Sequence, residues 1–134
     1  MKFVPKTEKE IEESSLLTEG EYDFEIISAI EGLSKTSGNL MTTVKLKFYD
    51  NGESVASFDD YLPAEGMDWK LRHFADSIGM LDQYETGEIL PEFLPGKNGR
   101  CKIKIQPAKN QWKARNTVAD YIPRKSVDDS DINF

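Results

Sequence analysis

Residues 40–52 read LMTTVKLKFYDNG, and this stretch decides the fold class. Its side chains alternate in polarity, a pattern typical of a β-strand with one buried face. The apolar face comprises Leu40, Thr42, Val44, Leu46 and Phe48, and the opposite face comprises Met41, Thr43, Lys45, Lys47 and Tyr49. The strand ends at Asp50-Asn51-Gly52, where Asn-Gly tolerates the positive φ angles of a tight hairpin turn. A strand over 53–62 should therefore fold back on the first.

Similar alternation occurs on both sides of this hairpin. A strand is predicted from Glu21, and the loop 32–39 (GLSKTSGN) connects it to residue 40. Residues 99–106 alternate clearly and predict a fourth strand. After a turn at 107–111, residues 112–122 predict a fifth.

One helix is predicted between the third and fourth strands. Its apolar stripe runs from Met67 to Ile78, and Gly79 is a natural stop. The connection 80–98 should pack down with a short helical turn. Three strands, a helix and two strands is the element order of the OB fold, a five-stranded Greek-key barrel whose helix plugs one end. The alternative is a plain α+β sheet with the helix packed on one side.

Length and composition restrict the class of protein. The chain has 134 residues, enough for one domain, which we place at 20–123 after a loosely ordered segment 1–19. The polar stretch 124–134 should form a disordered acidic tail. A single cysteine, Cys101, and a single histidine, His73, exclude a disulfide framework and a Cys/His zinc site. No apolar run approaches the roughly 20 residues of a membrane span. We expect a cytoplasmic protein without metal or cofactor.

Charge is segregated along the chain, although the net charge is −7. Residues 1–94 contain 8 basic and 20 acidic side chains, whereas 95–125 contain nine basic side chains and one acidic. Because salt screens fields within about 10 Å at 0.1 M, a basic surface can exist on an acidic protein. A solvated pair of basic strands is the simpler interpretation.

Basic strand faces interspersed with aromatic rings favour binding of single-stranded nucleic acid. Such sites combine a cationic track for phosphates with rings on which bases stack. In an OB fold the strand 2–3 face and the loops 1–2 and 4–5 form the site. The candidate DNA-binding residues are Lys35, Lys45, Lys47, Tyr49, Lys102, Lys104, Lys109, Trp112, Lys113 and Arg115.

The last residues combine acids with an apolar end. A partner with a small apolar pocket rimmed by basic groups could capture the Phe134 ring and its carboxylate together. The alternative is an acidic tail that serves solubility alone. The candidate partner-binding residues are Asp128, Asp129, Asp131, Ile132 and Phe134.

Catalysis has little support in the sequence, and we expect no enzyme. Asp59-Asp60 could belong to a magnesium nuclease, but its spacing matches no defensible motif. There is also no GxxxxGK[ST] phosphate loop. The main alternative to DNA binding is an OB-like adaptor that binds protein or RNA.

Two resemblances support DNA binding. The ending DDSDINF (128–134) resembles the acidic tip of bacterial single-stranded DNA-binding proteins, which recruits replication, repair and recombination enzymes; Asn133 stands where that family usually has proline. The body resembles small phage-encoded single-stranded DNA-binding proteins in GEYDFEI (20–26), KTSGN (35–39), VKLKFYDN (44–51) and WKLRHFADSIG (69–79). This resemblance implies an OB fold that coats displaced strands during phage replication or recombination.

Overall fold

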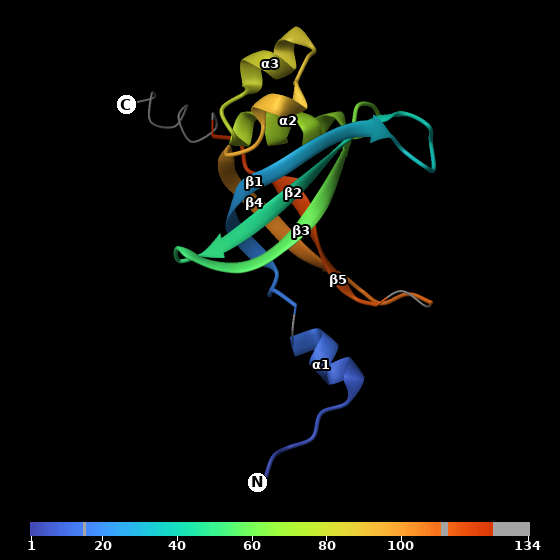
Figure 1. The fold of residues 1–134 in the computed structure, drawn as a ribbon, viewed down its shortest axis with the longest axis vertical. Helices are drawn as coiled ribbons and strands as arrows, with labels where there is room; N and C mark the ends of the chain where they lie inside the picture. Colours follow the sequence, from blue (N-terminus) through green and yellow to red (C-terminus); the bar gives the residue numbers. More distant parts are fainter. Residues whose placement is uncertain (15, 111–112, 125–134) are drawn as a thin grey trace.

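The computed structural model describes residues 1–14, 16–110 and 113–124, and its five antiparallel strands form one sheet (Figure 1). The protein is therefore mainly β. The strands are β1 (Gly20–Leu33), β2 (Leu40–Asp50), β3 (Glu53–Pro63), β4 (Asn98–Gln106) and β5 (Arg115–Tyr121). The helical segments are α1 (Glu8–Ser14), α2 (Asp68–Ser77), α3 (Leu81–Thr86) and the 3-10 turn η1 (Pro91–Phe93). Within the described ranges, no helix has the length and apolar character needed to cross a membrane.

The strand order is β3-β2-β1-β4-β5, so β1 is the central strand and β3 and β5 are the edges. The first part of β1 pairs with both β2 and β4, for example through Phe24, which lies opposite Phe48 and Gly99. A bulge interrupts the β1–β2 register between Ile26 and Ser28. Bulges increase the local bend and twist of a strand, which helps β1 to continue beyond β4.

The predicted hairpin between β2 and β3 is confirmed. Asn51 and Gly52 have φ angles of 51° and 82°, and Asp50 pairs with Glu53 across the turn. Positive φ at both central positions is what a type I′ turn requires, and this turn matches the twist of the flanking strands.

The predicted start of the last strand is wrong. The sequence indicated residues 112–122, whereas β5 begins at Arg115, which pairs with Gln106 at the end of β4. Lys113 and Ala114 therefore have no partner in the β4–β5 ladder. The 80–98 connection contains two short helical elements, α3 and η1, before β4 begins.

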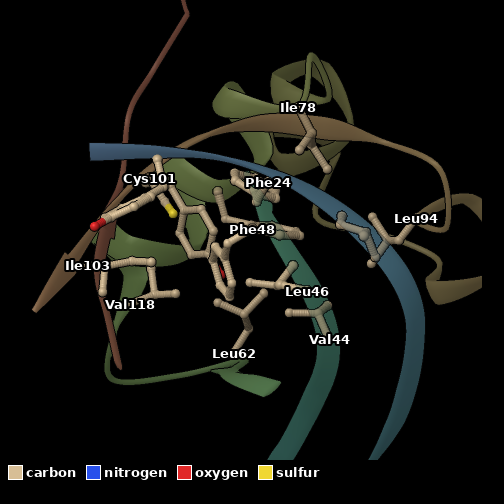
Figure 2. Close-up of a cluster of buried hydrophobic side chains, with 14 of the residues drawn as sticks. Phe24, Val44, Leu46, Phe48, Leu62, Ile78, Leu94, Cys101, Ile103 and Val118 are labelled. Carbon is tan, nitrogen blue, oxygen red and sulfur yellow. The ribbon is translucent and has the colours of Figure 1, made fainter. Parts of the chain in front are cut away.

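The inner face of the sheet and α2 enclose the hydrophobic core (Figure 2). Phe24, Phe48 and Phe74 are buried, as the alternation and the helical stripe predicted. The Tyr121 ring makes edge contacts with Phe24 and Phe74, at centroid distances of 5.3 and 5.0 Å. Because aromatic rings bury large areas and prefer such geometry, this cluster fixes α2 against the sheet.

The sheet is not closed by a β3–β5 ladder within the described residues, but a buried side-chain cluster connects these two edge strands. The Asp60 cluster consists of Asp60 on β3, Lys70 on α2 and Tyr121 on β5. Lys70 Nζ lies 3.1 Å from Asp60 Oδ1 and donates to the Val118 carbonyl oxygen at 3.0 Å. The Tyr121 hydroxyl donates to Asp60 Oδ2 at 2.6 Å. The cluster therefore holds both edges and the helix together.

A second link between α2 and β5 lies nearer the surface. His73 Nδ1 lies 3.0 Å from Asp120 Oδ1, and both side chains are partly buried. The helix residue His73 therefore has its partner on a strand, a contact that the structure reveals. Sequence spacing could not reveal a contact between positions 47 residues apart.

The segment between α1 and β1 is attached to β4 and β5. The Asn116 side chain accepts from the Leu17 backbone N–H at 2.8 Å and donates to the Leu17 carbonyl oxygen at 2.9 Å. Glu19 Oε2 accepts from the Ile105 N–H at 2.8 Å. Figure 1 shows α1 itself projecting away from the sheet.

Gly99 on β4 provides a stability prediction. A Cβ at this position would lie 2.6 Å from the Ser77 carbonyl oxygen and 3.1 Å from two Phe24 ring atoms. Gly99→Ala should therefore lower the free energy of unfolding by about 1–3 kcal/mol, the usual range for overpacking. Urea denaturation measures it. Gly32→Ala is the control, because nothing lies within 4 Å of its Cβ position. Equal stability of the two variants would contradict this packing.

Candidate nucleic-acid interface

The described cations of the predicted interface lie in two strand rows and two loops. The β2 row comprises Lys45, Lys47 and Tyr49 on the outer face of β2. The β4–β5 row comprises Lys102, Lys104 and Arg115. Because β1 lies between β2 and β4 in the sheet, the two rows are not neighbours on that side.

Carboxylates occupy the outer face of β1 between these rows. This acidic strip consists of Glu21, Asp23 and Glu25. Glu25 lies opposite Lys47 on β2, and Glu21 lies opposite Lys102 on β4. The acidic strip would repel phosphates, so one continuous cationic trough across β1 is not formed.

One of the β4 cations is already engaged by the acidic strip. The Arg100 guanidinium lies 3.0 Å from Asp23 Oδ1 and 3.7 Å from Glu21 Oε1. These exposed ion pairs contribute little stability, but they reduce the positive potential at this end of β4.

The opposite side of the molecule offers a different path between the two rows. The Asp60 cluster links β3 to β5 through buried side chains, so a path between the two rows can also be traced in the order β2, β3, β5, β4. On this path Ser57 lies opposite Lys47, and Thr117 lies opposite Lys104. Asp59 lies opposite Lys45 and is the one β3 carboxylate that faces outward near the β2 row. The path avoids the acidic strip but passes two other carboxylates, Asp59 and Asp120, of which Asp120 lies opposite Lys102 and is bonded to His73.

The aromatic rings near the β2 row differ in how exposed they are to a bound base. Tyr49 is half-buried; its hydroxyl donates to Glu25 Oε1 at 3.3 Å, and Lys47 Nζ lies 5.7 Å from its ring centroid. Tyr61 on β3 is 53% exposed and lies opposite Thr43. Thr43 in turn lies opposite Ile30, which is 69% exposed. Tyr61 and Ile30 thus extend the β2 row with an apolar surface on which a base could stack.

Tyr61 was not among the predicted binding residues, although its signal was present in the sequence. The alternation of β3 places Tyr61 and Asp59 on the face opposite Leu62 and Asp60. The rule that alternate residues of a strand share one face selected the β2 residues, and it would have selected Tyr61 as well.

The predicted loop cations are exposed, with one in each loop. Lys35 lies in the 34–39 loop, which is closed by bonds from the Ser34 N–H to the Asn39 carbonyl and from the Gly38 N–H to the Ser34 carbonyl, both 2.8 Å. Lys109 lies in the connection between β4 and β5.

At the start of β5 the cations continue from the loop into the strand. Lys113 is exposed, and Arg115 Nε and Nη2 lie 3.4 Å from Gln106 Oε1. Trp112 lies outside the described residues. So do the predicted partner-binding residues Asp128, Asp129, Asp131, Ile132 and Phe134.

The Asp59-Asp60 pair does not form a carboxylate cluster. Asp60 is buried and bonded to Lys70 and Tyr121, whereas Asp59 is exposed on the opposite face of β3. Among the described residues, no group of three potential metal ligands is found. The geometry therefore gives no support to the nuclease interpretation of this pair.

Comparison with known proteins adds no assignment. A scan against protein-family models and a search of curated proteins find no match to this chain.

Proposed function

We propose that this protein binds single-stranded DNA without sequence preference, using an OB-type barrel that is partly open between β3 and β5. The strand order β3-β2-β1-β4-β5 supports this architecture, because contact between β3 and β5 completes a five-stranded barrel. The position of α2 in the chain, between β3 and β4, is also that of the OB-fold helix. The Asp60 cluster supplies the contact across the opening.

The observation that carries the proposal is the outer face of β2 and β3. Lys45 and Lys47 project from β2, and the exposed Tyr61 ring projects from β3 on the same face. Phosphates would pair with the two lysines while a base stacks on Tyr61. The Lys35 loop flanks this face. The bound DNA strand would continue from here across β3 and β5 toward Lys104 and Lys102.

The biological setting follows from the sequence resemblances. The protein would coat displaced strands during phage DNA replication or recombination, in the cytoplasm of the host cell. Residues 126–134 would recruit replication or recombination proteins through the terminal Phe134 and the preceding aspartates. The basic surface and the acidic tail then perform separate tasks.

Salt dependence of oligo-dT binding tests the electrostatic part of the proposal. If about five cations touch phosphates, log affinity should fall against log salt with a slope near −3.5, at ~0.7 per contact. A Lys45→Ala/Lys47→Ala double variant should reduce that slope by about 1.4 and weaken binding. Lys6→Ala/Lys9→Ala is the matched control, because it removes the same charge from exposed positions outside the sheet. An unchanged slope in the double variant would refute the β2 row as a phosphate contact.

The stacking part has its own variant in the same titrations. Tyr61→Ala should cost about 1–3 kcal/mol of binding free energy, the contribution of one base stacked on a ring. Phe93→Ala is the matched control, since Phe93 is 59% exposed but lies on η1. Duplex DNA and RNA of equal length complete the series. Equal affinity for duplex DNA would contradict the proposal, and stronger binding to RNA would favour the adaptor alternative.

A further inference from the structure

A groove lies between the end of the β1–β2 hairpin that contains Glu31 and Leu40 and the region of α2 and α3. Its volume is about 480 Å³, which falls within the range of sites that hold small molecules or peptide side chains. It lies on the inner side of the hairpin and is distinct from the outer face proposed to bind DNA. The lining residues that matter for binding are Glu31, Leu40, Asp68, Leu71, Glu88 and Ile89.

The groove is largely apolar. Leu62 is buried, Leu71 and Ile89 pack against the core, and Leu40 and Leu90 are 44% and 37% exposed. An aliphatic side chain entering the groove would therefore cover apolar surface that is now exposed to water.

The charged groups of the groove are all acidic. Glu31, Asp68 and Glu88 line it, and no lysine or arginine is among the lining residues. The surrounding segment 64–94 contains seven carboxylates and two basic side chains, Lys70 and Arg72. Lys70 belongs to the Asp60 cluster, and the Arg72 guanidinium lies 5.6 Å from the Tyr84 ring centroid. The groove is thus unsuited to phosphates and to the acidic tail of the same chain.

We propose that this groove binds a cationic peptide segment of a partner protein, in which an aliphatic side chain is flanked by lysine or arginine. The aliphatic side chain would contact Leu40, Leu71 and Ile89, and the flanking cations would pair with the rim carboxylates. This proposal does not depend on DNA binding. It gives the protein a second interaction surface with the opposite charge preference to the β2 row.

The probe for this site is an acetylated, amidated five-residue peptide that alternates lysine and leucine. Titration into the 15N-labelled full-length protein at low salt should give saturable amide shifts around Leu40, Leu71 and Ile89. Peptides with serine in place of leucine, or glutamate in place of lysine, should produce no saturable shifts. Failure of the lysine–leucine peptide to bind, or shifts confined to the outer sheet face, would overturn the proposal.

Two pairs of variants separate charge from apolar contact. Glu31→Lys/Glu88→Lys should weaken the peptide at least tenfold, whereas Glu8→Lys/Glu53→Lys, with the same charge change elsewhere, should not. Leu40→Ser should also weaken it, whereas Leu33→Ser is the matched control, because Leu33 pairs with Leu40 but does not line the groove. Equal effects of test and control variants would refute the site. Self-association of the protein that Glu31→Lys/Glu88→Lys abolishes would identify a second copy as the occupant and would also refute it.

Discussion

Asp60→Ala should lower the free energy of unfolding by about 3–5 kcal/mol, the cost of breaking a buried ion pair by removing one partner. The Asp60 and Lys70 side chains are 11% and 7% exposed, so solvent cannot replace the lost carboxylate. The variant leaves the Lys70 ammonium with the Val118 carbonyl alone, and the Tyr121 hydroxyl loses its acceptor. Urea denaturation measures the loss. Amide hydrogen exchange in β5 should also become faster, because the cluster links this edge strand to β3.

Asp59→Ala is the control for this variant. Asp59 is the adjacent residue but faces outward, so its replacement should change stability by less than about 0.5 kcal/mol. Asp60→Leu/Lys70→Met/Tyr121→Phe tests whether the penalty comes from unpaired polar groups. The triple variant should recover much of the lost stability, because buried ion pairs are often replaceable by apolar groups of similar volume. A loss equal to the sum of the single effects would contradict this account.

The Asp60 cluster also shows which features of the fold the sequence can and cannot predict. Alternation along β3 places Asp60 between the inward positions Phe58 and Leu62, so a buried carboxylate could be predicted from parity alone. Its partners could not, because Lys70 lies on a helix and Tyr121 on a strand 61 residues away. Apolar periodicity describes one element at a time, whereas this cluster depends on how three elements meet.

The candidate interface likewise has features that the sequence predicts and features that it does not. Parity correctly assigned Lys45, Lys47 and Tyr49 to one face of β2, because the side-chain period of a strand is two. Which rows lie next to each other depends on strand order, and β1 with its acidic strip lies between β2 and β4. Hairpin signals predict which consecutive strands pair, but not that β1 also pairs with β4. The continuity of a cationic surface therefore could not be derived from the sequence.

Alkaline pH should unfold the protein through Cys101, with a loss of about 4 kcal/mol between pH 9 and pH 12. Burial, and to a smaller extent the Asp60 charge, raises the pKa of the Cys101 thiol from 9.0 to about 12. In this range the unfolded chain has released the thiol proton while the folded chain retains it. Stability therefore falls as pH rises, by about 1.4 kcal/mol for each pKa unit of difference.

Tyr121 adds to this loss above pH 10. Its burial, followed by the charge of Asp60 and the hydrogen bond to it, raises the pKa of its hydroxyl well above the usual value of 10.0. Urea titrations at half-unit steps from pH 8 to pH 11 should therefore show a slope that steepens near pH 10. Cys101→Ala should remove the decline between pH 9 and pH 10 and reduce the slope above pH 10 to the contribution of Tyr121 alone. If wild type and Cys101→Ala lose stability at the same rate below pH 10, the thiol does not control alkaline unfolding.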